Sequence, residues 1–526
     1  MNAFLRVFAG LVWGVLHGFD RLVFRGHLRQ ITTTEGMARY LHGRHVLYKD
    51  FRDFTARKTS QLIEASLAQA NQQKRPIIWL PSSSISKEEL AAQIAARDGI
   101  REGLICVFKC LEPCWTFEIR GNHASKELEV RGKNGKCAFL YHYYQHAEFG
   151  AMYGRVQTWF PFAMQIGING REWLVRQLQK QGLSYRRYDN KVTWVEDLPR
   201  AQQLLDAQLK ENWPQQLTAI RRLVHPSHPE IVEPLATDYY WSVFQSEWAS
   251  DFLFHRPEDI EHLQTQLLRH ALLNFRSVDV LRFLGHKVPA GGDVHGHFAG
   301  DITSKLKHRP EGLCLRHTVK GNSIKAYSGP GFLRLEGTMN HPYEFKVYRS
   351  KQNDPDGPQD WRPLRKGVAD IHRRAMVCQA ANDRYAEALA ASQDQTPLKE
   401  WTDPLCERAL APGNNPQRRR VRALNPLSPD DASLLETILD PKFAINGVRN
   451  RDLVQTLYPK PTSDAQEKRR RSARVTRLIR LLRAHRLLQK IPKSHRYQLS
   501  ANAQKRITAV LAARNANAET LTANAA

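Results

Sequence analysis

The amino-acid sequence predicts a multidomain α+β protein, and three observations lead to this class. Residues 1–200 mix strand-like apolar runs with amphipathic helical patterns. Residues 201–395 change from helical patterns to strand-like runs and hairpin signals. The C-terminal region carries three helical patterns followed by a short hairpin, the order of a winged helix. We therefore expect an α/β domain over 1–200, a helical and β domain over 201–395, a linker over 396–425, a winged helix over 426–515 and a flexible tail over 516–526.

The charge of the chain points to a polyanionic partner. The net charge is +26 over 526 residues, and a field of this size concentrates phosphate near the surface. A membrane surface is the alternative, but the charge is spread along the chain rather than placed beside an anchor. Seven cysteines, an odd number, favour a reducing compartment over a disulfide framework. We expect a cytoplasmic, nucleoid-associated protein that binds DNA or RNA and has no membrane partner.

The N-terminal elements follow from apolar spacing and cap residues. Ala3–Leu16 is apolar but too short to span a membrane, so we expect a buried first helix, with a signal peptide as the alternative. Gly18–Arg29 predicts a strand, a turn at Gly26 and a second element. The elements expected next are helices over 35–70, 87–96 (capped by Ser84 or Ser86) and 171–181, and strands over 75–80, 103–109, 114–120, 127–131, 137–144 and 155–168.

The segment Tyr239–Asp251 is expected within a helix and carries two candidate metal ligands. On a helix, Glu247 and Asp251 are four residues apart and share a face, where like charges repel by a few tenths of a kcal/mol. A metal ion or arginine side chains would neutralise them. The other elements expected in this region are helices over 198–209, 213–223, 237–254, 257–273 and 368–391, with strands over 277–350.

The hairpin within 313–349 is the best catalytic candidate in the sequence. Lys325 and Tyr327 stand two apart on one strand, and Arg334 and Glu336 stand two apart on the next, after the turn Ser328-Gly329-Pro330-Gly331. Residues two apart on a strand share a face, so the four side chains converge. They supply a carboxylate for Mg²⁺ or Mn²⁺, two cations for phosphate, and a hydroxyl group, which together suit phosphoryl transfer. The alternative is an amphipathic hairpin without chemistry.

The pattern K-x-Y…L-R-x-E in this hairpin resembles the core of rolling-circle replication initiators of phage and plasmid type. The resemblance implies that Glu336 faces a metal and that Lys325 contacts phosphate. The pair of histidines separated by a hydrophobic residue, which that family carries, has its nearest equivalent in Val294-His295-Gly296-His297, where glycine separates the histidines. The expected metal ligands are Glu336, Glu247 and Asp251.

Three further groups of residues are candidate sites. Asp20 opens a strand-like run, as in an RNase H-like nuclease core, but supporting acids are not evident from the sequence. Cys106, Cys110 and Cys114 are spaced by four on an apolar strand, so we expect buried free thiols and no zinc. Tyr141-His142-Tyr143-Tyr144 is expected to pack in the core rather than to stack bases.

The segment Lys468–Arg496 contains twelve Lys or Arg residues and no acid. Val475, Ile479 and Leu482 give its helix one apolar stripe, which leaves an arginine face for the major groove. It resembles the winged-helix domain of MarR-like regulators, which implies duplex-DNA binding; a solvated basic helix is the alternative. The residues expected to bind nucleic acid are Arg418, Arg419, Arg420, Arg469, Arg470, Arg471, Arg474, Arg477, Arg480, Lys493 and Arg496.

The stretches GFDRLVFRGHLR, RVQTWFPFAMQIGINGREWL, YWSVFQSEWASD, SIKAYSGPGFLRLE and RKGVADIHRRA resemble a family of uncharacterised, mobile-element-like bacterial proteins. The resemblance favours a DNA-handling protein and implies no mechanism. Together with the carboxylate and cations of the hairpin within 313–349, it leads us to expect a metal-dependent endonuclease or strand transferase that nicks or joins DNA. The alternative is a non-enzymatic DNA-binding regulator or RNA-binding protein, which would need no carboxylate site.

Overall fold

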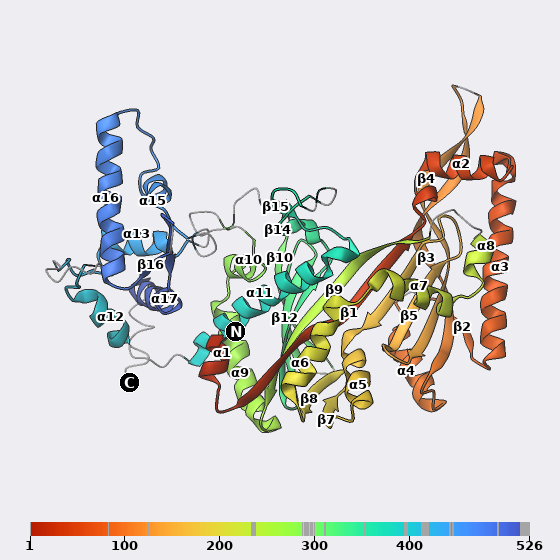
Figure 1. Ribbon diagram of the computed structural model, residues 1–526, viewed down its shortest axis with the longest axis horizontal. Coiled ribbons are helices and arrows are strands. Elements are labelled where there is room, and N and C mark those ends of the chain that lie inside the picture. Colours follow the sequence, from red (N-terminus) through yellow and green to blue (C-terminus); the bar gives the residue numbers. More distant parts are fainter. Residues whose placement is uncertain are drawn as a thin grey trace. The chain divides into compact units, whose positions relative to one another are not determined.

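The structure is a computed structural model of the chain (Figure 1). It describes residues 2–515, except 83, 125, 233–237, 287, 289–293, 295–297, 299, 310–311, 352–353, 355, 394–397, 412–419, 441–442, 444–446 and 492–493. The chain divides into two compact units. The first comprises Met1–Arg269 with Thr303–Glu387, and the second comprises His270–Ile302 with Ala388–Ala526.

The first unit is built on one large mixed sheet, which has eleven strands among the described residues. Two long strands, β1 (Val12–His27) and β9 (Tyr240–Phe254), pair antiparallel at its centre (Figure 1). Along the sheet the order is β10-β11-β12-β13-β9-β1-β6-β5-β4-β3-β2. The outer strands are β2 (Ile77–Trp79), β3 (Gly103–Asn122), β4 (Glu127–His146), β5 (Gly150–Gln157), β6 (Met164–Asn169), β10 (Ile302–Arg309), β11 (Gly312–Val319), β12 (Asn322–Gly329) and β13 (Phe332–Met339).

The sheet therefore joins strands from both sides of residue 200, where the sequence suggested a domain boundary.

Helices cover both faces of the sheet. Two hairpins lie beside them, formed by β7 (Tyr185–Tyr188) with β8 (Lys191–Val195) and by β14 (Lys346–Arg349) with β15 (Asp360–Pro363). The helices of this unit are α1 (Asn2–Val7), α2 (Thr34–Gly43), α3 (Phe51–Gln72), α4 (Lys87–Arg97), α5 (Gly170–Lys180), α6 (Leu198–Ala207), α7 (Trp213–Val224), α8 (His228–Val232), α9 (Pro257–Asn274) and α11 (Ile371–Ala390), of which α9 and α11 continue into the second unit.

The helices on the two faces are fixed by contacts to the central strands. On one face, Asn382 of α11 donates from Nδ2 to the carbonyl oxygen of Trp248, at 3.2 Å. On the opposite face, Leu205 of α6 packs over Gly18 of β1. Gly18 lies opposite Ala249, whose neighbours Glu247 and Asp251 point the same way because side chains alternate along a strand. This second face, here called the acidic face, carries the candidate site.

The helix predicted over 237–254 is wrong, because this segment forms β9. Both of its backbone edges are hydrogen-bonded, to β1 and to β13, so tertiary pairing outweighs the helical spacing. Gly26 is also no turn: β1 continues to His27, and a Cβ at Gly26 would lie 2.8 Å from the rings of Trp241 and Tyr239. The predicted helix over Ala3–Leu16 is shorter, since α1 ends at Val7 and β1 begins at Val12.

Most other predicted helices are confirmed, among them those over 87–96, 171–181, 213–223 and 257–273. Ser86 caps α4 and accepts a hydrogen bond from the amide of Glu89, as one of the two predicted cap residues. The paired short strands predicted over 103–109 with 114–120 are continuous in β3, and those over 127–131 with 137–144 are continuous in β4.

The second unit contains the helices and the short hairpin predicted near the C-terminus. One apolar cluster, including Leu435, Leu453, Val475 and Leu482, joins the helices that follow residue 397. Among the described residues, no helix of either unit is long and apolar enough to cross a membrane. The elements of the second unit are α10 (Ser277–Phe283), α12 (Leu398–Cys406), α13 (Pro429–Ile438), α15 (Asn450–Leu457), α16 (Ala465–Ala484), β16 (Leu488–Lys490), β17 (Tyr497–Leu499) and α17 (Ala501–Asn515).

Candidate metal centre

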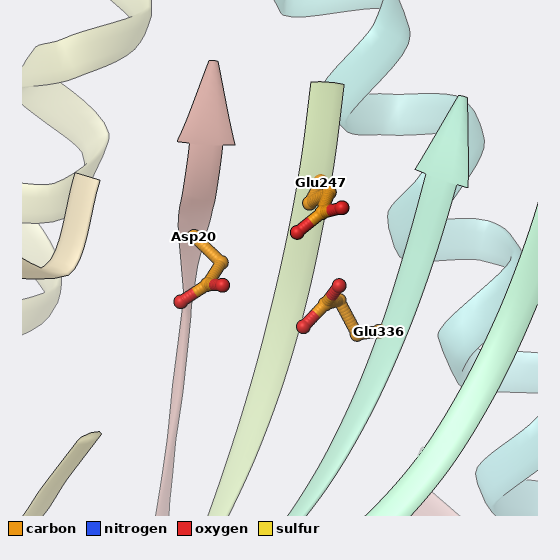
Figure 2. A group of neighbouring side chains, drawn as sticks. All are labelled: Asp20, Glu247 and Glu336. Atoms are coloured by element: carbon orange, nitrogen blue, oxygen red, sulfur yellow. The ribbon is translucent and has the colours of Figure 1, made fainter. Parts of the chain in front are cut away.

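Three carboxylates from three neighbouring strands meet on the acidic face of the sheet. Asp20 comes from β1, Glu247 from β9 and Glu336 from β13 (Figure 2). One oxygen of each carboxylate lies within 4.8 Å of the others. The residues are 9%, 8% and 0% exposed, so the cluster is held inside the protein rather than on a solvated surface. We call these three residues the acidic triad.

Strand register explains how the triad assembles. Thr338 lies opposite Glu247 and Glu336 lies opposite Ala249, so the two glutamates sit diagonally on adjacent strands of one face. On β1 the register shifts between Phe19 and Arg21, which makes Asp20 the extra residue of a β-bulge. A bulge redirects a side chain out of the regular alternation, and here it brings Asp20 to the glutamates.

Helix α5 begins beside the triad because of a cap and a glycine. The side chain of Asn169 accepts hydrogen bonds from the amides of Arg171 and Glu172. A Cβ at Gly170 would lie 2.2 Å from the carbonyl oxygen of Phe19, so this close approach of the helix to β1 requires glycine. The next residue, Arg171, is 1% exposed and places Nη2 3.0 Å from Oδ2 of Asp251.

Arg334 joins the triad to a second buried acid. Its Nη1 donates to Oδ1 of Asp20 at 2.6 Å, while its Nε and Nη2 donate to the two oxygens of Asp251. Arg334 is fully buried, as is usual only for a paired guanidinium. Because Arg334 and Arg171 both bind Asp251, this carboxylate is neutralised by arginine and lies outside the triad.

Lys325 and Tyr327 of β12 complete the site. Lys325 lies directly opposite Glu336, with Nζ 2.7 Å from Oε1, and Tyr327 lies opposite Arg334. The hydroxyl of Tyr327 accepts a hydrogen bond from Nη1 of Arg334 at 3.3 Å. The predicted convergence of the four hairpin residues is therefore confirmed in its geometry.

The local charges divide the carboxylates into two kinds. Burial raises the pKa of Glu336 to about 8; Lys325 opposes this rise, while Glu247 and Asp20 add to it. Burial also acts to raise the pKa of Asp20, but Arg334 and Lys325 outweigh it and bring this pKa down to about 2. The site therefore holds one carboxylate that is fully ionised at neutral pH and one that retains a proton until a cation stabilises its charge.

Several buried polar atoms around the triad have no hydrogen-bond partner among the described residues. They include Oε2 of Glu336, the hydroxyl of Thr338 and the side-chain carbonyl of Asn190. Asn190 contacts the triad through its other atom, since its Nδ2 donates to Oδ1 of Asp20 at 3.0 Å. Buried polar groups are normally paired, so unpaired oxygens around three acids fit a bound cation and its water molecules.

Of the three predicted metal ligands, two belong to this cluster. Glu336 and Glu247 meet, although Glu247 comes from a strand rather than from the expected helix; positions 247 and 251 share a face in either element. Asp251 is instead held by arginines, the alternative foreseen for it. The third member, Asp20, is not among the predicted metal ligands. The sequence offers a nuclease-like strand there only as a possibility without supporting acids, and without the pairing of β9 nothing in it links Asp20 to the two glutamates.

The structure describes most of the residues predicted to bind nucleic acid, and those on α16 are mainly exposed. On α16, Arg469, Arg470, Arg474, Arg477 and Arg480 are exposed. Their neighbour Arg471 is half-buried, and its Nε lies 2.9 Å from Oε1 of Glu467. Arg420 is exposed and Arg496 is described as well. Arg418, Arg419, Lys493 and the motif residues His295, Gly296 and His297 lie outside the described residues.

The cysteines and the aromatic–histidine segment pack largely as the sequence predicted, except that the free thiol of Cys114 is only partly buried. Cys106 and Cys110 are free and fully buried in an apolar cluster between β3 and β4, and burial raises the pKa of each thiol to about 12. Tyr141, Tyr143 and Tyr144 are buried, as is His142.

No protein-family model matches the chain, and neither curated proteins nor solved structures show a significant match to it.

Proposed function

We propose that this protein cleaves phosphodiester bonds of nucleic acid with the help of a divalent cation held by Asp20, Glu247 and Glu336. The acidic triad carries the proposal, because three convergent buried carboxylates provide the hard oxygen ligands that Mg²⁺ and Mn²⁺ prefer. The unpaired Oε2 of Glu336 supports it, since it marks a place where the protein alone leaves a polar group unsatisfied.

The surrounding cations suit a phosphate substrate. When bound, the divalent cation polarises the phosphodiester and stabilises the leaving oxygen. Lys325 and Arg334 add positive charge beside the triad and compensate the charge that develops on the transferring phosphoryl group. A water oxygen attacks phosphorus and one ester P–O bond breaks; the water gives up a proton and the leaving alkoxide takes one up, so that a phosphate monoester and a free hydroxyl result. In a joining reaction the hydroxyl of a second strand takes the place of water.

We assign Tyr327 a positioning role rather than that of nucleophile. Its ring is buried, and burial raises the pKa of its hydroxyl well above the usual value of 10, which disfavours the phenolate that would attack phosphorus. Its hydroxyl contacts Arg334, which in turn holds Asp20. Tyr327 therefore helps to orient the arginine that borders the triad.

The C-terminal segment supplies a second reason to propose DNA as the substrate. Helix α16 exposes five arginines on one surface while Val475 and Ile479 pack inward, and a short hairpin follows it. This order supports the predicted winged helix, whose basic helix would enter the major groove. With the sequence resemblance to mobile-element proteins, it leads us to propose a protein that nicks or joins DNA. The rival proposal, a regulator without chemistry, leaves the triad unexplained.

The decisive experiment compares the wild type with Glu336→Gln on supercoiled plasmid in the presence of Mg²⁺ or Mn²⁺. We expect the wild type to nick the plasmid and the variant to lose at least about a hundredfold in rate, because glutamine keeps the shape but removes the charge that binds the cation. DNA binding, measured by gel shift, should remain near the wild-type value.

Glu112→Gln is the matched control. Glu112 is a buried carboxylate on β3 that pairs with Arg155 and Lys87, far along the sheet from the triad. Its variant should still nick plasmid when corrected for the folded fraction. If wild-type protein nicks no plasmid with either metal, the enzyme proposal fails and the rival proposal, a DNA-binding protein without chemistry, is favoured. If Glu336→Gln and wild type cleave at equal rates, the acidic triad is not the catalytic site.

A further inference from the structure

A row of cations and aromatic rings extends from the triad along the same two central strands. We call Arg25, Arg29, Tyr240, Phe244 and Lys366 the arginine–aromatic strip. Register places part of it on the acidic face. Arg21 lies opposite Glu247, Arg25 opposite Ser242, and His27 opposite Tyr240. Paired residues share a face, and residues two apart on β1 share it as well. Arg25 and Tyr240 therefore lie on the face that carries Glu247.

Close cation–ring contacts hold the strip together. The guanidinium of Arg25 lies 3.9 Å from the centroid of the Phe244 ring, and Nζ of Lys366 lies 5.4 Å from the same ring. The guanidinium of Arg29 lies 3.5 Å from the Tyr240 ring, which is 38% exposed. Phe244 is the unpaired residue at an irregularity in the β1–β9 register, between Val243 and Gln245.

The strip carries positive charge without acidic partners. Among the described residues, Arg25, Arg29 and Lys366 form no ion pair with a carboxylate. Burial lowers the pKa of Arg25, and the nearby charge of Arg155 lowers it further. The pKa of Lys366 is lowered by burial and then by Arg25. Like charges gathered without an acid are stabilised when a polyanion binds.

We propose that the arginine–aromatic strip binds a single-stranded segment of nucleic acid and directs it to the acidic triad. The strip offers both groups that such a partner needs, cations for the phosphates and aromatic rings for unpaired bases, of which Tyr240 is exposed and Phe244 half-buried. Phe244 precedes Glu247 by three residues, roughly 10 Å along a strand, so a strand held on the strip lies next to the carboxylates. This inference names the substrate of the proposed function. Only the delivery of the strand to the triad rests on that function; binding at the strip does not.

The test measures binding of a fluorescently labelled 15-nucleotide oligothymidylate to the full chain in EDTA, which prevents cleavage; single-strand binding sites span about 4–16 nucleotides, so this length covers one site. All proteins carry Arg470→Ala, Arg474→Ala and Arg477→Ala, so that α16 does not dominate the signal. The strip variant Arg29→Gln/Tyr240→Leu/Phe244→Leu should bind at least about tenfold more weakly. Ultraviolet cross-linking and peptide mapping should place the oligonucleotide on residues 240–244.

The matched control is Trp79→Leu/Lys109→Gln. This pair is also an exposed ring beside a cation, with Nζ 6.0 Å from the ring, but it lies at the β2 edge of the sheet. The control should bind like its parent. Unchanged affinity of the strip variant, or cross-links that map away from the strip, would overturn the inference.

The outcome is separable from that of the proposed function. Glu336→Gln should keep full oligothymidylate binding, while the strip variant should keep its affinity for Mn²⁺. If cross-links map to the strip but the protein never nicks DNA, the strand-binding role of the strip is supported and the proposed nuclease function is rejected. If the protein nicks DNA but the strip variant binds the oligonucleotide like its parent, the nuclease function is supported and the role of the strip is rejected.

Discussion

Lys325 and Glu336 face each other directly across β12 and β13, with the amine nitrogen 2.7 Å from a carboxylate oxygen. This contact alone does not compensate for the burial of Glu336, since Glu247 and Asp20 add negative charge beside it. The carboxyl group therefore keeps a pKa of about 8, and a divalent cation that binds here must displace its proton.

This relationship predicts that metal binding depends on pH. Since Glu336 must lose its proton, the affinity for Mn²⁺ should rise by up to about tenfold per pH unit from pH 6 toward 8, and level off above it. Calorimetric titration at several pH values measures the slope. In Glu336→Gln the affinity should be lower and nearly independent of pH. A flat profile for the wild type would show that Glu336 is not a ligand whose proton is displaced.

The same shift predicts how stability depends on pH without metal. The pKa of Glu336 is about 8 in the folded chain and 4.5 without the fold. Between these values the folded state binds more protons, so the contribution of Glu336 to stability is complete below pH 4.5 and is lost as pH rises toward 8. Glu336→Gln should remove this pH dependence, so that its free energy of unfolding falls less than that of the wild type between pH 5 and pH 9. Thermal unfolding in EDTA at several pH values tests this; a variant that loses stability as steeply as the wild type over this range would contradict it.

Arg334 is expected to be essential for folding stability. Arg334→Met leaves the carboxylates of Asp20 and Asp251 buried with a missing partner, which should cost about 3–5 kcal/mol. Arg334→Lys should also destabilise, because an ammonium group cannot bond to both oxygens of Asp251 while it contacts Asp20. Denaturant unfolding measures both, and Arg120→Met, at an arginine side chain that is 63% exposed, is the control. Equal stability of Arg334→Met and wild type would disprove the bridging role.

The arginines of α16 should determine the salt dependence of duplex binding. Arg470→Ala/Arg474→Ala/Arg477→Ala removes three exposed cations. If each contacts a phosphate, the slope of log affinity against log salt should become less steep by about 2.7. Changing Arg471 instead should affect stability more than binding, because Arg471 is occupied by Glu467. Undiminished duplex binding by the triple variant would remove the proposed recognition helix.

We expect the purified, chelator-washed protein to hold no stoichiometric zinc. Cys106 and Cys110 point into an apolar cluster, where burial raises the pKa of their thiols to about 12 and disfavours the thiolates that zinc binds. Elemental analysis gives the answer directly. One zinc ion per chain would contradict this prediction, and loss of that zinc in Cys110→Ala would locate it.

Local patterns in the sequence were sufficient to predict the short-range features of this protein. The two-residue spacing of Lys325 with Tyr327 and of Arg334 with Glu336, separated by a glycine–proline turn, predicts a hairpin with four converging side chains. Ser86 before an acidic first turn predicts the start of α4. The acid-free arginine run and its apolar stripe likewise predict α16.

The tertiary structure decided which distant residues meet. Tyr240–Phe254 carries spacing that suits a helix, and it becomes a strand because β1 and β13 satisfy both of its backbone edges. That pairing and the bulge at Asp20 bring three distant carboxylates together. Glu247 lies 227 residues after Asp20 in the chain, and Glu336 lies 316 residues after it. Spacing along a sequence reports on neighbours within one element, whereas strand register across a sheet depends on every intervening element. The residues of the triad were therefore visible in the sequence, but their meeting was not.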